Sequence, residues 1–304
     1  MERTPFISFV IAYHNEPEAL LRDCIESIQA LPFMKDEAEI VVVDDGSKVP
    51  LSLPRLEEAI QDSNTKIMVI RQEESGLSVA RNTGISQSSG RYIQFVDADD
   101  CLIPSAYEAV LGQVRAGTAD LVMFRMSQSP SNIPTPKVRP QEWRGSGASF
   151  LQQCNLRAAA CAYAFRRDIL GDLRFYPGLF HEDELFTPLL FLRANMLVDM
   201  DAKAYFYRQH EGTITHSNSS EKVQKRLNDI RFIINELRFS DEYLLERRIR
   251  QLTVDYLQKS WTLTHSLCEL HRRSAELRRQ GFLPLPLRRY SPRYLFVAVI
   301  ARLF

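Results

Sequence analysis

The sequence contains few cysteines, and none of them are spaced as metal ligands. Five are scattered over 304 residues without a CxxC pair: Cys24, Cys101, Cys154, Cys161 and Cys268. Thiols in this arrangement are typical of reduced cytosolic proteins and argue against a disulfide framework or a zinc site. We therefore expect a cytoplasmic protein whose fold does not depend on disulfides.

Long hydrophobic runs are also lacking. The longest run covers residues 294–301, far short of the ~20 residues that a membrane-spanning helix needs. The first six residues lead almost directly into a strand-like run at residues 7–12, which leaves no room for a signal peptide. We expect that the protein does not cross a bilayer.

An excess of charge of one sign is absent as well. Lys plus Arg and Asp plus Glu both number 38, so no overall field attracts nucleic acid, which we exclude as a partner. The balance conceals an asymmetry, because residues 272–304 contain eight arginines and one acid, Glu276.

What is present is an ordinary globular composition, with 45% hydrophobic and 25% charged residues. The first half alternates between two patterns. Strand-like runs occupy residues 7–12, 39–43, 66–70, 91–96 and 120–126, and helical patterns begin at Pro17 and cover residues 54–62, 78–86 and 104–115. Such alternation predicts βαβ units and a mostly parallel sheet.

The second half predicts fewer strands and more helix. Residues 127–145 hold four prolines and predict a long loop. Helical patterns follow at residues 147–156, 182–193 and 219–279, the last with a break near Ser240 and Asp241, and residues 281–286 interrupt the helices before a basic, apolar tail.

The strongest chemical signal is the acidic loop Asp97-Ala98-Asp99-Asp100, which follows an apolar strand. Carboxylate oxygens are hard ligands that suit Mg²⁺ or Mn²⁺ bridged to a diphosphate. Such an ion neutralises charge that builds up on a leaving nucleotide. The alternative interpretation is a plain turn or helix cap.

Two further polar clusters follow predicted strands. Asp44 precedes Gly46 and offers a carboxylate to a uracil-like imide or a ribose hydroxyl; Tyr13 offers a ring to a base, and Glu16 offers hydrogen bonds to the base or its ribose. The alternatives are an ordinary turn after the second strand and a helix N-terminus capped by Asn15 after the first.

A fourth cluster, residues 76–84, contributes Arg81 as positive charge near a nucleotide. A surface arginine on an amphipathic helix is the alternative. Because ligands in open α/β sheets bind outside the carboxyl ends of the strands, the clusters after the predicted strands locate one site at one edge.

Together the four segments "FVIAYHNE", "VVVDDGS", "GLSVARNTGI" and "YIQFVDADD" resemble the family 2 glycosyltransferases of GT-A fold. The resemblance covers residues 5–103 closely and continues more loosely from Asp183 to about residue 215. It implies an α/β fold with a single Rossmann-like, mostly parallel sheet flanked by helices and a helical C-terminal extension. It also implies a nucleotide-diphosphate-sugar donor, most often UDP-linked.

The resemblance also assigns residues. It places five of them at the nucleoside: Ala12, Tyr13, Glu16, Asp44 and Arg81. Asp97 would lie by the ribose or sugar, and Asp99 would ligate Mn²⁺ or Mg²⁺.

Two later segments complete the implied site. In "FHEDE" the resemblance points to Asp183 as the base that takes the proton from the acceptor hydroxyl, in a single displacement that inverts the anomeric configuration. The alternative is that these acids only favour a helix N-terminus. In "YRQHEGTIT", Arg208 or His210 would contact phosphate or metal, whereas an exposed histidine is the alternative for His210.

The reading that follows is an inverting, metal-dependent, non-processive glycosyltransferase. A Gln-x-x-Arg-Trp motif of the processive synthases is absent from the sequence. The resemblance implies a glycan or lipid-linked oligosaccharide acceptor in capsule or other surface-polysaccharide assembly. We predict a catalytic domain at residues 1–215, with a nucleotide half to 126 and an acceptor half from 127, and a helical region at residues 216–304.

Two alternative functions stay open at this stage, and the tail has two interpretations. A sugar nucleotidyltransferase would usually show an N-terminal Gly-rich loop, which "AYHNEP" lacks, and a non-catalytic nucleotide-sugar binder or assembly protein would not need the full acid set. The tail of arginines with Tyr294 and Phe296 suits peripheral contact with an anionic inner membrane. Packing against the catalytic domain or another subunit is the other interpretation of the tail.

Overall fold

The computed structural model describes residues 4–52, 56, 64–128, 143–208 and 220–302. They form two compact units. The sheet unit comprises Met1–Gly147, Ala159–Gly178 and Arg193–His210, and the helical unit comprises Ala148–Ala158, Leu179–Leu192 and Glu211–Phe304. The chain passes between the units several times, so segments that the sequence assigns to one continuous domain before residue 215 are shared between them.

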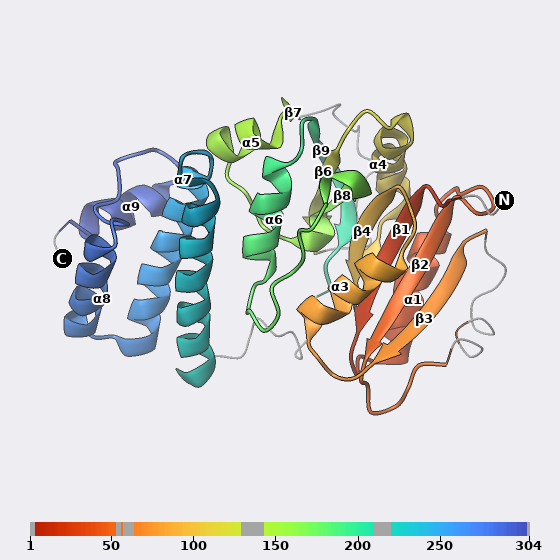
Figure 1. The fold of residues 1–304 in the computed structure, drawn as a ribbon, viewed down its shortest axis with the longest axis horizontal. Coiled ribbons are helices and arrows are strands. Elements are labelled where there is room, and N and C mark those ends of the chain that lie inside the picture. The colour runs from red at the N-terminus through yellow and green to blue at the C-terminus, as the bar shows by residue number, and fades with distance from the viewer. Residues whose placement is uncertain (1–3, 53–55, 57–63, 129–142, 209–219, 303–304) are drawn as a thin grey trace. The chain divides into compact units, whose positions relative to one another are not determined.

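In the part of the chain that the structure describes, the sheet unit is built on one mixed sheet of nine strands (Figure 1). The strands are β1 (Ile7–Tyr13), β2 (Ala38–Asp45), β3 (Lys66–Gln72), β4 (Tyr92–Asp97), β5 (Cys101–Leu102), β6 (Leu121–Ser127), β7 (Trp143–Gly145), β8 (Tyr163–Arg166) and β9 (Leu197–Phe206). Their order is β3-β2-β1-β4-β8-β6-β9-β5, with β7 beside β9. The β3-β2-β1-β4 portion is parallel, and β8 runs antiparallel to both β4 and β6.

Strands β1 and β2 are buried on both faces, which explains their continuous apolar runs. One face packs on α1 (Glu18–Gln29) and α4 (Pro104–Ala116), and the other on α3 (Leu77–Gln87). Gly84 allows α3 to approach closely, because a Cβ there would collide with the side chain of Val10.

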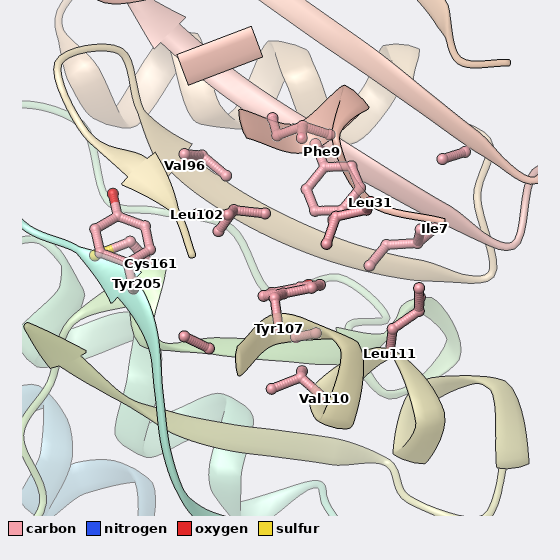
Figure 2. Packing of buried hydrophobic residues seen from close by; sticks show 14 of the residues in the cluster. Ile7, Phe9, Leu31, Val96, Leu102, Tyr107, Val110, Leu111, Cys161 and Tyr205 are labelled. Carbon is pink, nitrogen blue, oxygen red and sulfur yellow. The ribbon is translucent and has the colours of Figure 1, made fainter. Parts of the chain in front are cut away.

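The main core lies between β1 and the helices on its first face. Figure 2 shows Ile7 and Phe9 from β1 facing Tyr107, Val110 and Leu111 from α4, and all five are completely buried. The rings of Phe9 and Tyr107 lie 6.1 Å apart. This packing fixes β1, and with it the loops at its carboxyl end.

Four main helices make up the described residues of the helical unit. They are α6 (Asp183–Leu192), α7 (Ser220–Thr264), α8 (Leu267–Arg279) and α9 (Pro292–Ile300), and α5 (Gly147–Gln153) precedes them. Helix α7 is kinked at Asp241, which confirms the predicted break. Over the part of the chain described, no helix combines the length and the apolar character that a bilayer span needs.

Most elements of the first half match those expected from the sequence, and several of the second do not. The expected loop at residues 127–145 is wrong at its end, because Trp143–Gly145 pairs with β9 as strand β7. Residues 129–142 and most of the predicted helix at 54–62 lie outside the described residues. Strands β5, β8 and β9 had not been expected.

Candidate active site

The parallel strands end in register at one edge of the sheet. Tyr13 of β1 lies beside Asp44 of β2, and Asp44 lies beside Arg71 of β3. On the other side of β1, Ala12 lies beside Asp97 of β4. The structure thus brings the loops after β1, β2 and β4 together, as expected for the carboxyl edge of a parallel sheet.

Asp44 is completely buried, and both oxygens of its carboxylate accept hydrogen bonds. It accepts hydrogen bonds from the backbone N–H of Ser47 at 2.9 Å and of Leu51 at 3.2 Å, and it pairs with the Arg71 guanidinium at 2.6 Å. Burial raises the pKa of Asp44, but these hydrogen bonds and the Arg71 charge outweigh it and leave the pKa below its ordinary value. The side chain of Arg71 is itself 44% exposed, so it is the member of the pair that a ligand meets.

The neighbouring Asp45 fixes the next loop rather than facing solvent. Its carboxylate accepts from the Gln72 side chain at 2.7 Å and from the backbone N–H of Ser75 and Gly76 at 2.9 and 2.8 Å. Gly46, in the turn directly after Asp45, has φ 70°. A Cβ there would lie 2.6 Å from the Glu74 backbone nitrogen. The turn therefore requires glycine.

At the end of β1, Tyr13 is buried and its hydroxyl donates to the carbonyl of Glu16 at 2.7 Å. The Glu16 carboxylate accepts from the His14 backbone N–H at 2.6 Å. Burial raises the pKa of Glu16, and the charge of Asp99 adds to this shift. The Glu16 carboxylate therefore lies within electrostatic reach of the acidic loop.

Arg81 of α3 forms an ion pair with Asp97 at the end of β4. Its guanidinium donates to the Asp97 carboxylate at 2.9 Å, and its side chain is only 6% exposed, against 32% for Asp97. The rings of Phe95 and Phe175 lie 5.8 and 5.3 Å from the guanidinium carbon. These contacts hold a fixed positive charge behind the acidic loop.

Asp100 is the buried member of the acidic loop. It accepts from the Tyr205 hydroxyl at 2.8 Å and from the Arg208 backbone N–H at 2.8 Å. Burial, followed by the charge of Asp97, raises the pKa of Asp100 to about 8. The loop therefore divides its acids between one locked inside and two facing outward.

The donors present suit a cation that a substrate helps to hold. In the regions the structure describes, His, Cys, Asp and Glu side chains form no group of three or more that would enclose a metal ion. Asp97 pairs with Arg81, and both Asp97 and Asp99 are partly exposed. Mg²⁺ is commonly held by one or two carboxylates plus substrate phosphates and water, so Asp99 fits such an ion without a protein cage.

Arg208 lies beside the acidic loop, where its guanidinium pairs with Asp23 at 3.0 Å and contacts the Cys101 sulfur at 3.5 Å. The Arg208 guanidinium is thus a positively charged group beside the acidic loop, in addition to that of Arg81. His210 lies outside the described residues.

Asp183 is the first residue of α6, which belongs to the helical unit. It is partly exposed. Its neighbour Glu184 pairs with the buried Arg248, which also donates to the carbonyl of Leu156 at 2.9 Å. Burial lowers the pKa of Arg248 to about 10, while the charges of Asp255 and Asp183 oppose this shift.

Two residues of this edge, Arg71 and Tyr205, were not among the expected site residues. Asp45 and Asp100 lay in the expected acidic clusters but had no assigned role. The position of Arg71 at a strand end was a usable signal, since its neighbours in the sheet were already candidates. Tyr205 was harder to identify, because it bonds Asp100 from 105 residues away and lies on β9, a strand that was not expected.

The sequence of the chain is similar to those of known proteins. A family model described as "Glycosyl transferase family 2" matches residues 8–174. Uncharacterized glycosyltransferase YibD of Escherichia coli K12 is 25% identical over 257 residues, which cover 80% of this chain and 72% of that one. Poly(ribitol-phosphate) beta-N-acetylglucosaminyltransferase TarS of Staphylococcus aureus MW2 is 25% identical over 203 residues, 66% of this chain but only 35% of TarS.

Solved structures show the same fold. TarS 1-349 of S. aureus in complex with UDP-GlcNAc superposes with a TM-score of 0.63 at 20% identity, over 96% of this chain and 79% of that chain. Mannosyltransferase PcManGT of Pyrobaculum calidifontis, in complex with GDP-Man and Mn2+, gives 0.57 at 14% identity, over 99% and 88%. These similarities confirm the predicted GT-A fold, a sheet flanked by helices with a helical C-terminal region.

Proposed function

The chain belongs to the glycosyl transferase family 2 and is a glycosyltransferase, and we propose that it is an inverting, metal-dependent, non-processive enzyme. The donor is a nucleotide-diphosphate sugar, with UDP as the nucleotide. The observation that carries the proposal is the shared strand-end edge. There Tyr13 lies beside Asp44, Ala12 lies beside Asp97, and Arg81 pairs with Asp97.

The nucleoside end of the donor lies over the ends of β1 and β2. The residues proposed there are Ala12, Tyr13, Glu16, Asp44 and Arg81. Because Asp44 is completely buried while Arg71 is 44% exposed, Asp44 acts by holding Arg71 toward the base or ribose. Asp97 lies by the ribose or sugar, with its orientation fixed by Arg81.

The diphosphate end lies over the acidic loop. Asp99 holds Mn²⁺ or Mg²⁺, which supplies positive charge for the leaving diphosphate when it is bound. Arg208 adds cationic charge at the same edge, and we include His210 as a further candidate for metal or phosphate. The relative PcManGT was solved with GDP-Man and Mn2+, which makes a divalent ion plausible here.

Asp183 serves as the general base of the transfer. Its carboxylate takes the proton from the acceptor hydroxyl while that oxygen forms a bond to the anomeric carbon. The bond from that carbon to the nucleoside diphosphate breaks on the opposite side, and its electron pair leaves with the diphosphate. One displacement of this kind inverts the anomeric centre.

The acceptor is a hydroxyl of a glycan or of a lipid-linked oligosaccharide in surface-polysaccharide assembly, such as a capsule. Residues 1–215 form the catalytic domain and residues 216–304 a helical region with a basic, apolar tail. The enzyme acts at the cytoplasmic face of the inner membrane, with the tail in peripheral contact.

The test is a thermal-shift and donor-hydrolysis screen of UDP-, GDP- and dTDP-sugars with Mn²⁺ and with chelator. We expect a UDP-sugar to raise the melting temperature, because it binds only the folded protein, and to be hydrolysed slowly only with metal. Asp183→Asn should retain the donor-induced shift and lose transfer by about 10²- to 10⁴-fold.

Asp172→Asn is the matched control, because Asp172 is 94% exposed and loses the same charge. Wild-type transfer by Asp183→Asn would remove this residue from its role. A donor shift without any hydrolysis or transfer would favour a binding protein, and pyrophosphate release from a nucleoside triphosphate would favour a nucleotidyltransferase.

A further inference from the structure

The tail of the helical unit divides its apolar side chains between two faces. Leu283, Leu285, Tyr294 and Val297 are at most 8% exposed, so they pack inside the unit. Leu287, Phe296 and Val299 are instead 53%, 65% and 50% exposed. Packing inside the helical unit therefore accounts for only some of the apolar side chains of the tail.

The inward contacts hold α9 in one orientation. The Tyr294 hydroxyl donates to the carbonyl of Pro286 at 3.0 Å, and the Arg278 guanidinium donates to the carbonyl of Ala301, just past the end of α9, at 2.8 Å. At the start of α9, Arg293 pairs with Asp255 of α7 at 2.5 Å. These contacts hold α9 in place, so its exposed side chains belong to an ordered helix and not to a frayed end.

The exposed side chains of the tail, which we call its outer face, are apolar and basic. Phe296 and Val299 are three residues apart on α9 and therefore share a face. Arg288 and Arg289 are exposed directly after Leu287. The sequence after Glu276 contains six arginines and no acid at all. A partner for this face must accept apolar side chains and carry negative charge around them.

We propose that this face, defined by Leu287, Arg288, Arg289, Phe296 and Val299, docks on a bilayer of anionic phospholipids. The apolar side chains enter the interface between headgroups and acyl chains, and the arginines contact the headgroup phosphates. The inference deepens the proposed function and rests on it, since it brings the enzyme to a lipid-linked acceptor.

A second exposed apolar pair shows why charge decides the assignment. Phe239 and Tyr243, at the kink of α7, are 91% and 77% exposed, more than any apolar side chain of the outer face. They flank Asp241 and Glu242, whose charges an anionic surface repels. Exposure alone would select the kink, whereas charge complementarity selects the tail.

The experiment is co-sedimentation of the full chain with vesicles of phosphatidylcholine alone or mixed with phosphatidylglycerol, without donor. We expect binding to the anionic vesicles only. Arg288→Ala/Arg289→Ala should weaken it at least tenfold, since each arginine near an anionic surface contributes about a fivefold factor. Phe296→Ser/Val299→Ser should reduce it by a similar factor.

Phe239→Ala is the matched control and should bind like the wild type. Equal losses in this control, equal binding to neutral vesicles, or unchanged binding by both tail variants would each overturn the proposal. So would a wild-type dimer that Phe296→Ser/Val299→Ser converts to a monomer, because the face would then be a subunit interface. A donor-induced thermal shift without vesicles tests the proposed function separately from docking.

Discussion

The loops at residues 44–47 and 97–100 flank the same strand, β1, and both follow parallel strands with a run of acids, yet they use their carboxylates differently. In the first loop Asp44 and Asp45 are buried, and between them they accept at least five hydrogen bonds. The donors lie in the loop itself, at Leu51, at the end of β3 and in the loop that follows β3. In the second, Asp100 is locked inside, Asp97 shares its charge with Arg81, and Asp99 stays partly exposed.

The difference teaches that acid-rich loops of similar sequence divide into structural and chemical roles according to their hydrogen-bond partners. A carboxylate whose oxygens accept backbone N–H groups holds a loop in shape. A carboxylate on a partly exposed residue can be reached by a cation or a sugar. The first loop shapes the edge on which the second works.

The largest expected effect concerns Asp99, on the available side of this comparison. Asp99→Ala should lower metal-dependent donor turnover by about a thousandfold, or about 4 kcal/mol in the barrier, because the carboxylate proposed to hold the ion is gone. The melting temperature should change little. Glu74→Ala, at the same edge and 71% exposed, is the control; turnover unaffected by loss of Asp99 would break the comparison.

The next effect concerns Asp45, on the structural side. Asp45→Ala should lower the free energy of unfolding by about 3 kcal/mol, because the Gln72 side chain and the N–H groups of Ser75 and Gly76 lose their acceptor. Urea unfolding measures it. If the variant has normal stability and loses only donor binding, Asp45 contacts the donor and does not act by holding the loop.

A smaller effect is expected at the turn between Asp45 and Ser47. Gly46→Ala should cost about 2 kcal/mol in unfolding free energy, because φ is 70° and the new Cβ would lie 2.6 Å from the Glu74 nitrogen. Gly112→Ala is the control, since it lies within α4 with open space around it and should stabilise by roughly 0.5–1 kcal/mol. Equal changes of one sign in both variants would contradict the geometry.

The smallest effect is a pH dependence that originates at Asp44. Its pKa is lowered in the folded state, so its contribution to stability is present above the unfolded pKa of about 3.9 and is lost as the pH falls through the folded value. The stability gap between wild type and Asp44→Asn should therefore narrow as the pH falls from about 5 to about 2 in urea titrations. A gap independent of pH would mean that the charge of Asp44 contributes nothing.

The parallel half of the sheet was predictable, and the rest less so. Apolar runs such as residues 39–43 announce a strand buried on both faces without reference to the rest of the chain. Strand β9 did carry a signal, since Asp199, Asp201 and Lys203 alternate with apolar residues at period two. Strand β8, Tyr163–Arg166, is too short to announce itself.

By itself, the sequence determined the order of strands and helices in the first half, and therefore the edge at which Tyr13, Asp44 and Asp97 meet, because parallel strands place their carboxyl ends on one side. Only the tertiary structure decided which carboxylates are buried. Asp100 is closed in by Tyr205, and Asp44 is held by Arg71 from the next strand. Such burial depends on partners distant in sequence, and no local pattern of residues encodes it.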